Sequence, residues 1–270
     1  MSTRVISLFR RLIRDYYKEH GRDLPWRRTA DPYHIFVSEV MLQQTQAPRV
    51  AAKFPRFIQA FPTVESLAGA STHDVLAAWQ GMGYNRRALA LKKSAAAIVG
   101  RHAGRIPRTV EELDALPGIG HATACSIAAF AFNEPVVFIE TNIRAVFIQF
   151  FFPEGKRIDD TEIEGLLTAA MDRTNTREWY NALMDYGAML KGREANPARR
   201  SAHHRAQPRF EGSRRQLRGR VITLLTRHAA LTKTALASAA ECDRKTIETV
   251  LAALEKEGFV TRLRGRYSVC

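Results

Sequence analysis

The sequence predicts an all-α fold over about its first 190 residues, followed by a small second domain. Apolar residues recur at helical spacing along most of this first part, and proline or glycine residues separate one apolar run from the next. The only strand-like stretch there, residues 136–139, is too short to support a sheet. After residue 190 the composition and the charge both change, which indicates a domain boundary.

The N-terminal segment predicts an amphipathic helix. Its apolar residues recur at spacings of three and four, and we expect them to form one buried face; they are Val5, Leu8, Phe9, Leu12, Ile13 and Tyr16. Further helices are expected over residues 33–45, 48–60, 64–69, 72–80, 85–101, 109–115, 121–131, 141–151, 159–173 and 177–190. Together these helices are expected to form one domain spanning residues 1–190.

Residues 191–213 predict a basic linker. The stretch 191–220 contains ten Lys or Arg residues against two Glu, and its first two-thirds contain few large apolar side chains. Such a segment is either a mobile, solvated tether or an arm that lies along phosphate groups. The sequence leaves both interpretations open.

Residues 214–270 predict three helices and a terminal hairpin, a pattern that resembles a winged helix. Asp243 is the expected N-cap of the third helix, and the hairpin turns at Arg264 and Gly265. In a winged helix the third helix enters the major groove and the wing touches the DNA backbone. We therefore expect Arg244, Lys245 and Arg264 to contact DNA, with a packing or dimerisation module as the alternative.

The charge predicts a polyanionic partner. The formal net charge is +14 and the isoelectric point is near 10.2, which favours nucleic acid or an anionic membrane surface. No run of about 18 apolar residues is present, so no membrane span is expected. The three cysteines lie far apart, which argues for a reducing compartment and against a disulfide framework or a cysteine metal site. We expect a cytoplasmic, nucleoid-associated monomer.

A glycine-containing turn at residues 116–120 separates two predicted helices. Its two glycines, Gly118 and Gly120, allow a tight turn with outward-facing backbone amides, and the next helix adds the free N–H groups of its first turn. Such a hairpin is able to bind a phosphate without regard to base sequence. A plain connection between two helices is the alternative.

Four segments occur in the order and approximate spacing of one enzyme family: 24–27 (LPWR), 37–46 (VSEVMLQQTQ), 81–84 (GMGY) and 116–120 (LPGIG). On these segments the chain, over about residues 5–190, resembles the adenine-DNA glycosylases, the MutY type of the helix-hairpin-helix superfamily. The resemblance implies a two-lobed helix-hairpin-helix glycosylase domain that binds double-stranded DNA containing a mispaired or damaged base. It also implies hydrolysis of the bond between the base and its deoxyribose.

The resemblance further implies two catalytic carboxylates. Glu39 matches the family's acid, which protonates the adenine ring at N7, and a carboxyl held against apolar neighbours keeps its proton at neutral pH. Glu140 stands where the family has an Asp that stabilises the positively charged sugar, and Asn142 matches a following Asn. The extra methylene of Glu140 shifts the reach of the carboxylate. The structural alternatives are an exposed helical residue for Glu39 and a helix cap for Glu140.

Two departures from the family bear on the chemistry. Ala122 stands where members that also cleave the DNA backbone have a Lys nucleophile, so we expect a monofunctional glycosylase. Most relatives bind an iron–sulfur cluster through four cysteines just after the segment that resembles residues 185–190 (DYGAML). This chain has no cysteine from there to Cys242, so we expect no iron–sulfur cluster and no other cofactor.

The resemblance assigns further residues to the base and to DNA. Trp26, Arg27 and Ala122 are expected beside the base pocket. Tyr84 is expected to wedge into the base stack, with a core tyrosine as the alternative. The remaining expected DNA contacts are Gln43, Gln44, Arg86, Arg87, Gly118, Gly120, His121 and Thr123.

The sequence therefore predicts a monofunctional DNA glycosylase of base excision repair that removes adenine or a modified purine from a mispair. A thymine or uracil mismatch glycosylase is the nearest alternative, since those enzymes share the scaffold. A non-catalytic winged-helix DNA-binding protein is the alternative from another class, and the presence of both carboxylates disfavours it.

Overall fold

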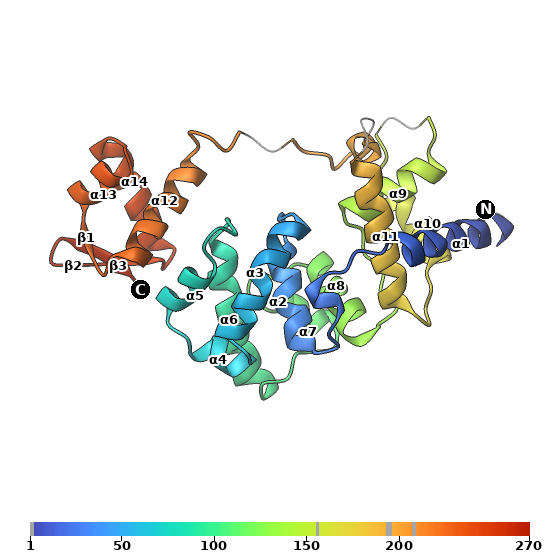
Figure 1. The fold of residues 1–270 in the computed structure, drawn as a ribbon, viewed down its shortest axis with the longest axis horizontal. Helices are drawn as coiled ribbons and strands as arrows, with labels where there is room; N and C mark the ends of the chain where they lie inside the picture. Colours follow the sequence, from blue (N-terminus) through green and yellow to red (C-terminus); the bar gives the residue numbers. More distant parts are fainter. Residues whose placement is uncertain (1–2, 155–156, 193–195, 207–208) are drawn as a thin grey trace. The chain divides into compact units, whose positions relative to one another are not determined.

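The computed structural model describes residues 3–154, 157–192, 196–206 and 209–270 (Figure 1). The contacts within the chain divide it into two compact units. Unit 1 consists of Met1–Glu39, Arg108–Ala115 and Ile119–Ala206. Unit 2 consists of Val40–Pro107, Leu116–Gly118 and Gln207–Cys270. The chain therefore leaves unit 1 within one helix and returns to it twice.

Unit 1 is built around helix α11 (Thr176–Lys191), which packs against α1, α8 and α9 (Figure 1). Trp179, Tyr180 and Phe147 are fully buried in this core, where aromatic side chains supply much of the apolar area. The other elements are α1 (Thr3–His20), η1 (Pro25–Arg27), α2 (Pro32–Leu42), α7 (Val110–Asp114), α8 (His121–Phe132), α9 (Thr141–Phe151), α10 (Asp160–Ala170) and η2 (Pro197–Arg200); α2 continues into unit 2.

The buried face of α1 differs from the predicted one. The helix is amphipathic as expected, but its buried residues are Ile6, Phe9 and Ile13. Three of the residues predicted to be buried are exposed by 44%, 48% and 44%; they are Val5, Leu8 and Leu12. The reason is tertiary, because Phe9 makes edge-on ring contacts with Phe147 and Trp179 and so fixes the rotation of the helix.

Part of the predicted linker is folded. Helix η2 packs against α9 and α11, with Pro197 and Ala198 buried. The Arg200 guanidinium donates hydrogen bonds to the carbonyl oxygens of Ile148 and Pro153, both at 2.9 Å. These bonds join the segment around η2 to the last turn of α9 and to the residues that follow it. The segment belongs to unit 1 and is not a tether. Residues 193–195 and 207–208 of the predicted linker lie outside the described residues.

Unit 2 contains a helical part and the winged helix. The helices are α3 (Ala47–Ala60), α4 (Val64–Gly69), α5 (Thr72–Ala78), α6 (Arg86–His102), α12 (Arg214–Arg227), α13 (Lys233–Ala239) and α14 (Arg244–Lys256). The strands β1 (Leu231–Thr232), β2 (Val260–Leu263) and β3 (Arg266–Val269) form an antiparallel sheet of order β1-β3-β2. The predicted three helices and terminal hairpin are confirmed, and Asp243 caps α14 by accepting from the Thr246 N–H at 2.8 Å.

The helices predicted between residues 33 and 190 are confirmed, with ends that differ by three residues or fewer. Residues 136–139 form no strand in the structure. Among the helices of the described residues, none has the length and apolar character needed to cross a bilayer.

Candidate active site

Helix α2 carries the first candidate catalytic carboxyl, Glu39. Its neighbours Ser38 and Val40 are buried and Glu39 itself is half-buried. Burial raises the pKa of Glu39 to about 7; a hydrogen bond with Ser126 of α8 opposes this rise, and the Glu140 carboxylate adds to it. A large fraction of Glu39 therefore keeps its proton at neutral pH, as a general acid requires.

The raised pKa of Glu39 predicts a pH-dependent difference in stability between the wild type and Glu39→Gln. The folded state binds this proton more tightly than the unfolded state, so stability is lost as pH rises from the unfolded pKa through about 7. Above that range the loss in the free energy of unfolding is at most about 3 kcal/mol. We expect the Gln variant to melt several degrees higher than the wild type at about pH 8 and at a similar temperature at about pH 4.5. Calorimetry at both pH values tests this, and an equal difference at both would contradict it.

Glu140 is the N-cap of helix α9. Its Oε1 accepts hydrogen bonds from the backbone N–H of Asn142 at 2.6 Å and of Ile143 at 3.0 Å, and its Oε2 accepts from Asn142 Nδ2 at 3.2 Å. Burial raises the pKa of Glu140, while the Ile143 amide and the charge of Lys191 oppose this rise. The capping role foreseen as the alternative is thus present. It also fixes the carboxylate at a rigid helix end, which is compatible with a catalytic role.

Two contacts with α11 position the segment that carries Glu140. The Tyr180 hydroxyl donates to the carbonyl oxygen of Val136 at 2.8 Å and accepts from the Phe138 N–H at 3.4 Å. Gly187 lies directly against Asn142, where a Cβ atom would stand 2.2 Å from the Asn142 carbonyl oxygen. Only a residue without a side chain allows α11 to approach α9 this closely.

Arg27 is held by a buried ion-pair network beside Trp26, which is itself buried. The Arg27 guanidinium donates to both oxygens of Asp185, at 2.7 and 2.8 Å, and Arg22 Nε donates to the same carboxylate at 2.6 Å. Burial alone would raise the pKa of Asp185, but the hydrogen bonds and charges of these arginines hold it below its usual value. The Arg27 charge in turn opposes the rise in the pKa of Glu39. The network therefore links Arg27 to the candidate acid.

Sequence reasoning missed three residues of this site: Ser126, Asp185 and Gly187. Ser126 is a buried polar residue in the mostly apolar helix α8, and Asp185 is an acidic residue with a fully buried side chain on α11. Both are the kind of buried polar residue that needs a partner, and that signal could have singled them out. Gly187 sits in the interior of a helix, which is itself unusual and indicates a close approach.

In the Leu116–Gly120 turn Gly118 has a left-handed backbone, whereas Gly120 has an ordinary φ of −102°. Gly118 has φ +76°, and a Cβ there would stand 2.4 Å from the Ala90 Cβ. Ser94 donates to the Pro117 carbonyl oxygen at 2.7 Å, and Gln43 Nε2 donates to that of Gly118 at 3.3 Å. The other expected DNA contacts nearby lie at the start of α8. Gly120 is the N-cap of this helix, His121 and Ala122 are exposed, and Thr123 is half-buried.

The guanidinium of Arg87, one of the expected DNA contacts, is bonded to backbone carbonyl oxygens. It donates to the carbonyl oxygens of Val40 at 3.1 Å, Met41 at 2.9 Å and Gln43, and burial lowers its pKa to about 10. The carbonyls at the C-terminal end of α2 have no partners within the helix, and the guanidinium satisfies them. Arg87 therefore fixes the turn that presents Gln44, which is exposed with φ +51°.

The other candidate DNA contacts of unit 2 are at its surface. Arg86 is exposed and forms an ion pair with Glu257, with its Nε at 2.7 Å from Oε2. Tyr84 is half-buried. On the winged helix, Arg244 and Lys245 are exposed in the first turn of α14, and Arg264 is exposed at the turn between β2 and β3.

The donor set does not fit an iron–sulfur cluster. The sequence has three cysteines, whereas the cluster needs four thiolates. Cys125 is buried in α8, and Cys242 and Cys270 belong to the winged-helix part of the chain. No group of three or more His, Cys, Asp or Glu side chains within the described ranges is arranged to hold a metal ion.

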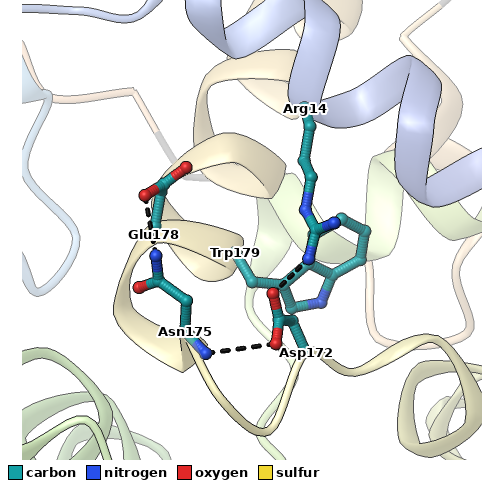
Figure 2. A pocket seen from close by; sticks show the side chains of 5 residues that line it. All are labelled: Arg14, Asp172, Asn175, Glu178 and Trp179. Carbon is teal, nitrogen blue, oxygen red and sulfur yellow. Dashed lines mark hydrogen bonds and ion pairs between the residues drawn. The ribbon is translucent and has the colours of Figure 1, made fainter.

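Unit 1 contains a cavity of about 210 Å³ that shares no lining residue with the candidate site (Figure 2). Its lining residues are Arg14, Asp172, Asn175, Glu178 and Trp179. They bond mainly to one another: Arg14 pairs with Asp172, and Asn175 Nδ2 donates to Glu178 at 2.8 Å. The lining joins α1 to the start of α11 and contains no candidate catalytic residue.

Comparisons with known proteins identify the family of the chain. A family model described as the HhH-GPD superfamily base excision DNA repair protein matches residues 37–170, and one of the MarR family matches residues 216–266. The adenine DNA glycosylase of Mycobacterium tuberculosis is 33% identical over 94% of this chain and 91% of that protein, and the protein of the same name from Mycolicibacterium smegmatis is 32% identical over 78% of each. A thermostable thymine-DNA glycosylase has a similar fold, with a TM-score of 0.63 at 22% identity over 72% of this chain and 91% of that one. The chain therefore belongs to the helix-hairpin-helix superfamily of base excision DNA repair proteins, in its adenine DNA glycosylase family.

Proposed function

We propose that this chain is a monofunctional glycosylase that removes adenine or a modified purine from mispairs in duplex DNA. The names of its curated relatives, adenine DNA glycosylases, support adenine as the base that is removed. The structural observation that carries the proposal is that two half-buried carboxyls of unit 1, Glu39 and Glu140, are near enough for the charge of Glu140 to raise the pKa of Glu39. One carboxyl has a pKa near 7, and it is coupled electrostatically to a second carboxyl that is fixed at a helix end.

The two carboxyls would divide the reaction between them. Protonated Glu39 donates its proton to N7 of the extruded purine, and the C1′–N9 bond then breaks with its electron pair moving to the base, which leaves neutral. The Glu140 carboxylate stabilises the positive charge that develops on the sugar. It also accepts a proton from the water whose oxygen bonds to C1′, which leaves an abasic site. Proton exchange with solvent restores both groups.

A panel of duplexes tests the proposal, each with one adenine placed opposite guanine, cytosine, 8-oxoguanine or thymine, beside duplexes with thymine or uracil opposite guanine. We expect abasic sites at adenine mispairs, with little preference for 8-oxoguanine over guanine opposite the adenine. Strands should break only after added alkali, and borohydride should trap no adduct, because Ala122 offers no amine. Removal of thymine or uracil with adenine untouched in every mispair would overturn the adenine assignment.

We also propose that the winged helix binds the duplex, and that the protein acts as a monomer associated with the nucleoid. Its positive charge supports the association with DNA. The exposure of Arg244 and Lys245 at the start of α14 supports groove contact by this helix.

The double variant Arg244→Ala/Lys245→Ala is expected to weaken duplex binding and to flatten its salt dependence. Each lost phosphate contact removes about one unit from the slope of log affinity against log salt. The matched control is Arg227→Ala/Lys256→Ala, which removes the same charge from exposed positions at the C-terminal ends of α12 and α14. Fluorescence anisotropy between low and physiological salt measures both. Equal losses of duplex affinity in the two variants would show that binding depends on net charge alone and would contradict a specific contact by the start of α14.

A further inference from the structure

The winged helix packs against the helical part of unit 2 through polar contacts. Helix α12 lies against α5, and its Thr223 hydroxyl donates at 2.7 Å to Oε1 of Gln80, which follows α5. Glu257, which follows α14, accepts from Arg86 at 2.7 and 2.8 Å and from Arg218 of α12 at 2.6 Å. These contacts bring α12 to the turn that carries Tyr84.

Tyr84 has an unusual backbone conformation, with φ +47°. A residue with a bulky side chain rarely adopts this left-handed conformation, so the surrounding contacts must hold it there. On one side the Arg87 guanidinium lies 5.3 Å from the centre of the Tyr84 ring, and Arg87 is itself fixed by its bonds to backbone carbonyls.

The second contact with Tyr84 comes from the winged-helix part. Arg215 of α12 donates from Nη1 to the Tyr84 hydroxyl at 3.1 Å, and its guanidinium lies 5.6 Å from the centre of the Tyr84 ring. Arg215 thus contacts Tyr84 both at the hydroxyl and over the ring. The guanidinium also lies 5.3 Å from the Phe210 ring, which restricts its own position.

We propose that Arg215 is a positioning residue for Tyr84, by which the C-terminal domain holds the wedge in the orientation from which it enters the base stack. The proposal rests on the proposed function in one respect, because it takes base extrusion as the step in which Tyr84 acts. A wedge whose ring is already ordered replaces lost stacking at a smaller entropic cost than one that must be ordered during extrusion. Removal of Arg215 should therefore slow excision without touching the carboxyls that perform it.

The test is a double-mutant cycle on single-turnover excision of adenine from a mispair. Arg215→Ala is expected to lower the excision rate about tenfold, because it removes one hydrogen bond and one cation–π contact. Arg214→Ala is the matched control, because Arg214 is the exposed neighbour on α12 and its loss changes the charge equally. Tyr84→Ala is expected to lower the excision rate further. The double variant Tyr84→Ala/Arg215→Ala is expected to excise no more slowly than Tyr84→Ala alone. Additive losses would show that Arg215 acts on DNA directly and would overturn the proposal.

A second measurement needs no activity. In protein labelled with ¹³C-tyrosine, the ring signal of Tyr84, identified by its absence in Tyr84→Phe, is expected to shift in Arg215→Ala and to stay in place in Arg214→Ala. An unchanged signal in Arg215→Ala would overturn the positioning role. If the wild type excised no adenine, the proposed function would fail, and the NMR comparison would still decide whether Arg215 orders Tyr84.

Discussion

Replacing Glu39 with Gln is expected to lower single-turnover excision by about 10²–10⁴-fold, while the affinity for the duplex stays near that of the wild type. The amide is nearly isosteric with the acid and can still bond to Ser126. It has no proton to transfer to the purine, so the base remains a poor leaving group. Excision is measured as abasic sites formed with enzyme in excess, and affinity by fluorescence anisotropy.

The matched control is Glu164→Gln, which makes the same Glu-to-Gln change at an exposed position on α10 and should excise at the wild-type rate. The wild-type rate itself should fall as pH rises through about 7, because only the protonated form of Glu39 donates. An undiminished rate in Glu39→Gln would mean that another group protonates the base.

Gly187→Ala is expected to damage both stability and excision, although the change adds one methyl group. The new Cβ would stand 2.2 Å from the oxygen, 2.6 Å from the carbonyl carbon and 2.7 Å from the Cα of Asn142. All three are backbone atoms, so α9 must move relative to α11. Overpacking of this kind costs about 1–3 kcal/mol. A shift of about 1 Å in the cap at Glu140 should lower excision about 100-fold.

Gly165→Ala provides the control for Gly187→Ala. Gly165 also lies inside a helix, α10, but a Cβ there meets nothing within 4 Å. Alanine favours helix more than glycine does, so this variant should be more stable by up to about 1 kcal/mol, with normal excision. Thermal melts and single-turnover rates of both variants decide the matter. If Gly187→Ala behaved like Gly165→Ala, the contact between α11 and Asn142 would not position Glu140.

The sequence by itself determined the helices, because they depend on local spacing and on breakers. The Asp243 cap and the hairpin at Arg264 are likewise local, since each involves residues close in sequence. The candidate acid Glu39 was found because its segment is a specific motif. Each of these features is readable within about ten residues.

Only the tertiary structure decided how these elements meet. The contact of Phe9 with Trp179 determines which face of α1 is buried. The Arg87 guanidinium donates to carbonyl oxygens at the C-terminal end of α2. The Arg200 guanidinium bonds part of the predicted linker to α9. The tertiary structure also supplied Ser126 and Asp185 as partners for Glu39 and Arg27. Two physical reasons act. The Phe9 ring packs against aromatic rings of helices that are distant in the sequence. A buried polar group or an unsatisfied carbonyl must find a partner, and that partner lies far away in the sequence, where no local pattern records it.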